Sequence, residues 1–87
     1  MHEGQAREEM QTGIDAKNLK KNPILILIFE NIEKELLDFI RNSDPSDSKG
    51  REEAYYQLNA IQAVQLKLQS LINDGKVADR FLQGMRK

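Results

Sequence analysis

The sequence predicts an all-α protein: an antiparallel hairpin of two long helices with short flanking N- and C-terminal helices, assembling into a bundle. The first supporting observation is residues 51–74, where apolar side chains recur at alternating steps of three and four and so share one helical stripe. The stripe consists of Ala54, Leu58, Ile61, Val64, Leu68, Leu71 and Ile72. A second stripe precedes it at residues 23–41, and a short turn joins the two. A turn of this length makes consecutive helices antiparallel neighbours.

The N-terminal residues 1–13 are polar, contain two glycines and show no sustained periodicity. We expect a flexible tail here, or a frayed helix around residues 6–11, with His2 solvated. A helix of about one and a half turns should follow, capped by Asp15 and closed at Asn22-Pro23. The predicted organisation is a flexible tail at 1–13, one helical-hairpin domain at 14–83 and a flexible end at 84–87.

The first long helix is predicted from Pro23 to about Arg41, with Asn22 as its N-cap. The residues expected to face the second long helix are Leu25, Phe29, Ile32, Leu36 and Phe39. The uninterrupted apolar run at 24–29 is also compatible with a short strand. The sequence offers no second strand to pair with it, so we favour the helix.

The second long helix should begin after a turn at 42–48, where Ser46, Asp47 or Ser48 can cap it. Gly75 is expected to end this helix, because glycine is favoured just after a helix C-terminus. The apolar residues beyond it predict a final short helix. They are Val77, Ala78, Phe81 and Leu82.

Composition and charge argue against several classes of protein. The chain has 87 residues, a formal charge of −1 and no cysteine. The near-neutral charge disfavours a dedicated nucleic-acid binder, and the lack of cysteine excludes disulfides and zinc–thiolate sites. The longest apolar run, at 24–29, is far shorter than the roughly 20 residues of a membrane span. The N-terminus lacks the pattern of a signal peptide, so we expect neither export nor membrane insertion.

No catalytic constellation is recognisable in the sequence. It contains no Gly-rich phosphate loop and no His-Glu-x-x-His pair. Glu30, Glu33 and Glu35 could ligate a metal in a bundle, but the Glu-x-x-His motifs of such sites are missing, so a solvated face is favoured. We therefore expect no enzymatic activity, no catalytic or metal-binding residue and no cofactor.

Two clusters of basic residues are the candidates for anion contact. They consist of Lys17, Lys20 and Lys21 in the first cluster and of Lys76, Arg80, Arg86 and Lys87 in the second. Either cluster could contact phosphate groups. No aromatic residues are interleaved with them, so a contribution to solubility is the favoured interpretation.

Apolar side chains outside the predicted helix–helix contact indicate an interface. The start of the first long helix is apolar nearly all round, which predicts burial on every side. Tyr55 and Tyr56 project about 100° apart, so at least one faces outward or into a partner, unless both pack on the closed end of the hairpin. The proposed interface residues are Ile24, Ile26, Leu27, Tyr55, Tyr56 and Phe81. We expect a homo-oligomer, either a dimer or a higher assembly.

Four motifs occur in order along the chain: Asn22-Pro23, Asp44 with Asp47, Gly50-Arg51-Glu52, and Gly75-Lys76-Val77-Ala78. In this order they resemble a family of small tailed-bacteriophage helical-hairpin proteins encoded among structural genes. The resemblance covers about residues 16–78. Its motifs are helix caps and turns, so it implies a hairpin and transfers no functional residue. It also implies a role in virion morphogenesis, a location in the host cytoplasm or virion, and other phage structural proteins as further partners.

Three functions are compatible with these observations. The favoured hypothesis is a non-enzymatic protein that acts through self-association and protein binding during virion or head assembly. The first alternative is a small-ligand or nucleotide-binding protein that sequesters a signal of host defence. The second is a DNA-packaging accessory, which the charge and the lack of a helix-turn-helix signature disfavour. Nucleic acid is therefore not an expected partner.

Overall fold

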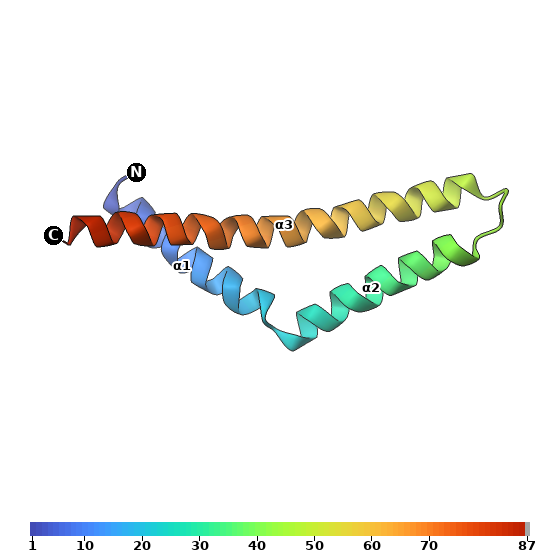
Figure 1. Cartoon of the computed structure of the whole chain (residues 1–87), viewed down its shortest axis with the longest axis horizontal. Coiled ribbons are helices and arrows are strands. Elements are labelled where there is room, and N and C mark those ends of the chain that lie inside the picture. The colour runs from blue at the N-terminus through green and yellow to red at the C-terminus, as the bar shows by residue number, and fades with distance from the viewer. Residues whose placement is uncertain (87) are drawn as a thin grey trace. The chain divides into compact units, whose positions relative to one another are not determined.

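The computed structural model describes residues 1–86 and shows an all-α chain (Figure 1). Its helices in this part are α1 (Glu3–Lys20), α2 (Pro23–Asn42) and α3 (Ser48–Met85). Across the described residues no strand is present, so the apolar run at 24–29 is helical, as predicted. The chain divides into two compact units. The α1–α3 unit comprises residues 1–22 and α3 from Leu66 onward, and the α2–α3 unit comprises residues 23–65.

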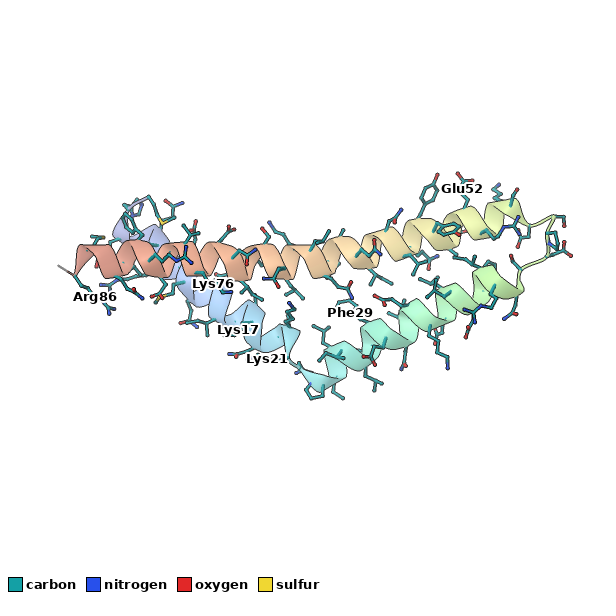
Figure 2. The ribbon with its side chains drawn as sticks, in the orientation of Figure 1. Lys17, Lys21, Phe29, Glu52, Lys76 and Arg86 are labelled. Carbon is teal, nitrogen blue, oxygen red and sulfur yellow. The ribbon has the colours of Figure 1, made fainter. Side chains whose placement is uncertain are left out.

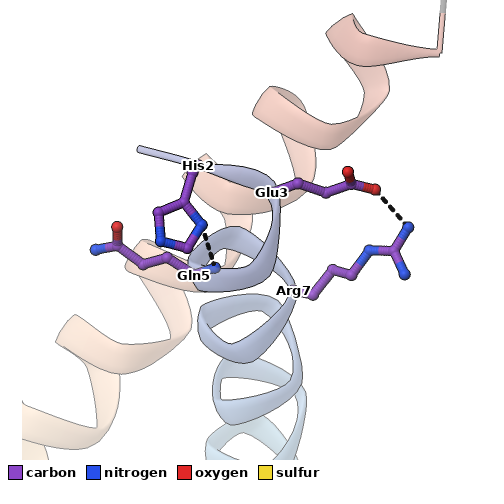
Figure 3. Close-up of polar contacts among 4 residues, drawn as sticks. All are labelled: His2, Glu3, Gln5 and Arg7. Atoms are coloured by element: carbon purple, nitrogen blue, oxygen red, sulfur yellow. Dashed lines mark hydrogen bonds and ion pairs between the residues drawn. The ribbon is translucent and has the colours of Figure 1, made fainter.

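Helix α1 begins where a flexible tail was predicted. His2 caps it, because its Nδ1 atom accepts a hydrogen bond from the backbone N–H of Gln5 at 3.4 Å (Figure 3). Glu3 lies in the first turn, where a negative charge favours a helix, and pairs with Arg7 one turn later (Figure 3). The predicted cap, Asp15, instead lies inside the helix.

The flexible tail predicted for residues 1–13 is not observed, and the alternative, a helix around residues 6–11, is correct in type but too short. The sequence understates α1 because this helix buries only small residues. Its buried positions are Ala6, Gly13 and Ala16, and residues this small do not form a recognisable apolar stripe in the sequence. Ala6 packs with Ala78 and Leu82 of α3 in the buried cluster of the α1–α3 unit. The helix is therefore held by close contact with α3 rather than by an apolar stripe of its own.

Helix α2 begins at Pro23, as predicted, and ends at Asn42. In the turn that follows, the Asp44 carboxylate accepts hydrogen bonds from the Ser46 hydroxyl at 2.7 Å and the Ser46 N–H at 2.8 Å. These bonds lower the pKa of Asp44 from its ordinary value. Asp47 then caps α3 by accepting a hydrogen bond from the N–H of Gly50 at 3.0 Å. The predicted turn and the predicted start of the second long helix are thus confirmed.

Contact between α2 and α3 in the α2–α3 unit agrees only in part with the predicted residues. Leu25, Phe29 and Leu36 are half-buried, whereas Ile32 and Phe39, predicted to face α3, are exposed.

On α3 the contact is shifted by one residue. Ala54 is buried, and Ile61 is half-buried. Val64, predicted to face α2, is 50% exposed. Gln65 is half-buried in its place and donates a hydrogen bond from Nε2 to Oε1 of Glu33 at 3.0 Å. The step of four from Ile61 to Gln65 stays on one face of the helix as well as the predicted step of three to Val64 does. The hydrogen bond between Gln65 and Glu33 offsets the cost of partly burying these two polar side chains.

Helix α3 does not end at Gly75 but continues to Met85. No glycine in the described part of the chain has a positive φ angle, so Gly75 does not adopt the left-handed conformation of a helix terminator. The short helix predicted at 77–82 is the last part of α3. Gly75 instead lies in close contact with Gly13 of α1.

Candidate functional site

Helices α1 and α3 come into backbone contact at two glycines, Gly13 and Gly75. An ideal Cβ placed on Gly13 would lie 2.8 Å from Cα of Gly75 and 3.0 Å from the carbonyl oxygen of Leu71. An ideal Cβ on Gly75 would lie 2.9 Å from Cα of Gly13. Distances this short leave no room for a methyl group on either residue. The two backbones are therefore in direct contact, which only glycine allows.

An open pocket of about 280 Å³ lies beside this crossing, within the α1–α3 unit. Its apolar lining comes from Met10 and Ile14 of α1 and from Ile72 of α3. Charged residues complete the lining: Lys17 of α1, and Lys76 and Asp79 of α3. Figure 2 shows Lys17 and Lys76 on the two helices of this unit. The pocket therefore combines an apolar surface with two ammonium groups.

The other predicted anion-contact residues are placed differently. Lys20 donates a hydrogen bond from Nζ to Oε1 of Gln69. Lys21 is the C-cap residue of α1, and its backbone N–H bonds to carbonyl groups of the last turn. Arg80 is exposed on α3. Of the predicted anion-contact residues that the structure describes, Lys17 and Lys76 line one pocket, although they are far apart in the sequence. Lys87 lies outside the described residues.

A second candidate surface is the exposed apolar ridge of α2. Ile24, Ile28, Ile32 and Phe39 are separated by four, four and seven residues, so they share one flank of the helix. All four side chains are exposed, and Ile24 is the most exposed at 63%. An open groove of about 400 Å³ continues the ridge, where Ile32 and Phe39 face Ala54 of α3.

The predicted interface residues lie partly on this surface. Ile24, Ile26 and Leu27 are exposed on α2, but only Ile24 belongs to the apolar ridge. Ile28, which the predicted set lacks, completes the ridge, and its spacing of four from Ile24 could have identified it.

The aromatic members of the predicted interface differ from one another in their surroundings. Tyr55 and Tyr56 are both exposed, so neither is buried against α2. The Tyr56 hydroxyl donates a hydrogen bond to Oε1 of Glu52 at 2.7 Å, which raises the pKa of Tyr56. Phe81 packs against the buried cluster of the α1–α3 unit and is half-buried there. Phe81 therefore contributes to packing within the chain.

Within residues 1–86 there is no group of three or more histidine, aspartate or glutamate side chains arranged to hold a metal ion. Of the three candidate carboxylates on α2, Glu33 contacts Gln65. None of the helices in the described part has the length and apolar character needed to cross a membrane.

Comparison with known proteins finds no matching family model, no matching curated protein and no matching solved structure. The resemblance to small bacteriophage proteins therefore rests on the sequence motifs alone.

Proposed function

We propose that this chain is a non-enzymatic helical hairpin that acts through self-association and protein binding. The observation that carries the proposal is the exposed apolar ridge of α2. Exposed apolar side chains that lie next to one another on one face are typical of an interface. Pairing two hairpins through this ridge would form a four-helix bundle, in which each α2 covers the other.

The energetics of the ridge set the expected strength of self-association. Burying a large aliphatic side chain completely is worth about 1.5–3 kcal/mol, so burying the exposed half of each of four side chains gains about 3–6 kcal/mol. In a symmetric dimer both chains bury this ridge, so the gain in free energy doubles to about 6–12 kcal/mol. Association costs an estimated 4–15 kcal/mol in lost freedom of motion. The most favourable combination of these terms leaves about 8 kcal/mol, which corresponds to a Kd of about 1 μM, and every other combination gives a weaker dimer.

The motif resemblance extends the proposal to a role in virion morphogenesis, with other structural proteins as partners. The polar outer faces of α2 and α3 would remain free for those partners in a bundle closed by the apolar ridge. Mass spectrometry of purified virions tests this part of the proposal separately, because self-association alone does not require presence in the particle.

Light scattering at tens of micromolar tests the proposal directly. We expect a mass of at least twice the 10.0 kDa of one chain. Ile28→Glu places a charge in the ridge and should return the mass to that of a monomer. Val77→Glu is the matched control, because Val77 is also an exposed aliphatic residue but lies on α3 in the other unit. A monomeric mass for the unmodified chain, or equal effects of the two variants, contradicts self-association through α2.

A further inference from the structure

We propose that the pocket beside the Gly13–Gly75 crossing binds a small amphiphilic carboxylate, whose charged group lies between Lys17 and Lys76. The proposed site lies in the α1–α3 unit and uses no residue of the apolar ridge of α2. It therefore goes beyond self-association and does not depend on it.

The glycine crossing creates the apolar part of this site. The two glycines of the crossing contribute no side chains, which leaves space beside the contact. Here Met10, Ile14 and Ile72 border that space. Ile72 is buried against the crossing, whereas Ile14 remains 46% exposed. An apolar ligand body placed on Ile14 would remove that surface from water, which is favourable.

The charges of the pocket select an anion. Lys17 and Lys76 reach it from different helices, and within residues 1–86 neither forms an ion pair, since the pairs present are Arg7–Glu3 and Arg41–Asp38. Asp79 is the opposing charge in the lining, and its Oδ2 atom accepts a hydrogen bond from Gln83 at 3.0 Å. Two lysines and one aspartate leave the lining with a net charge of +1.

Two features favour a carboxylate with a short apolar chain over a phosphate group. The lining residues lie inside α1 and α3, where the backbone N–H groups already bond within the helices and cannot cradle a phosphate. The volume of about 280 Å³ has room for a short acyl chain. Octanoate, with about ten heavy atoms, is the matching probe. Because the pocket is open to solvent, binding should be weak, with a Kd of about 1 mM.

Chemical-shift titration of the ¹⁵N-labelled full chain tests the site. Sodium octanoate should shift the amide signals of Gly13 and Gly75. Octanol, which has the same chain without the charge, should bind roughly tenfold more weakly. Inorganic phosphate, an anion without an apolar chain, should produce no comparable shifts.

Substitutions of the three charged residues distinguish octanoate binding in this pocket from nonspecific binding elsewhere on the chain. Lys17→Gln and Lys76→Gln should each weaken octanoate binding about three- to tenfold, since one charge-assisted contact at a partly solvated site is lost. Asp79→Asn should strengthen binding about threefold, because it removes the opposing charge. Lys34→Gln, at an exposed lysine of α2, is the matched control and should change nothing.

Circular dichroism verifies that each variant keeps the helical content of the unmodified chain. Equal binding of octanol and octanoate, shifts confined to α2, or weaker binding in Asp79→Asn would each overturn the proposal. So would the absence of shifts at about 10 mM octanoate, tenfold above the expected Kd.

Discussion

At the scale of single residues, Gly13 and Gly75 control how closely α1 and α3 approach. In a helix interior, replacing glycine by alanine normally stabilises by about 0.5–1 kcal/mol. Here the new methyl group would lie within 3.0 Å of backbone atoms of the facing helix, which cannot move without separating the two helices. Overpacking of this kind costs about 1–3 kcal/mol. Gly13→Ala and Gly75→Ala should therefore each lower the melting temperature by about 5–15 °C.

Gly84 provides the control for this prediction. A Cβ on Gly84 meets no atom within 4 Å, although the residue also belongs to α3. Gly84→Ala should leave the melting temperature unchanged or raise it slightly, because only helix propensity changes. If all three variants melt like the unmodified chain, the two backbones are not in direct contact.

At the scale of the helices, the sequence predicts an element well where large apolar residues mark it. The starts of α2 and α3 follow from Pro23 and from the polar turn, whose local hydrogen bonds can be anticipated from residue types. The missing information concerns contacts between distant residues. Gly75 indicates the end of a helix when it is read locally, whereas in the structure Gly13 and Gly75 both lie inside helices that touch at these two residues.

Of the two candidate surfaces, the one formed by residues close together in the sequence could be predicted, and the one formed by distant residues could not. The apolar excess at the start of α2 was visible in the sequence, because it depends on residues close together in one helix. The pocket was not visible as a site, because Lys17 and Lys76 are 59 positions apart in the sequence and meet only through the packing of α1 on α3.

The shift from Val64 to Gln65 gives a prediction for the contact between α2 and α3. Leu36 is half-buried and lines the groove with Ala54, whereas Val64 is 50% exposed. Leu36→Ala should cost about 2 kcal/mol, the lower end of the range for buried leucines, because burial is only partial. Val64→Ala should cost less than about 0.5 kcal/mol. Urea unfolding of both variants measures the difference. If Val64→Ala lowers the free energy of unfolding more than Leu36→Ala does, the shift is wrong and Val64 lies against α2.

At the scale of the whole molecule, charge determines which large ligands can bind. The chain has 13 lysine and arginine residues and 14 aspartate and glutamate residues. The basic residues are also divided among different contacts. Lys17 and Lys76 share their pocket with Asp79, and Lys20 is bonded to Gln69. A phosphate backbone needs several free cations arranged along one surface.

We therefore expect DNA, RNA and cyclic dinucleotides to bind no more tightly than about 100 μM at physiological salt, which corresponds to about 5.5 kcal/mol. Titration calorimetry at two salt concentrations measures this. Weak binding that disappears at higher salt agrees with scattered phosphate contacts, because each contact releases a counterion. Micromolar binding of a cyclic dinucleotide would instead favour ligand sequestration over self-association as the main function. Lys17→Gln would then show whether the dinucleotide uses the pocket: loss of binding places it there, and unchanged binding points to another surface of the chain.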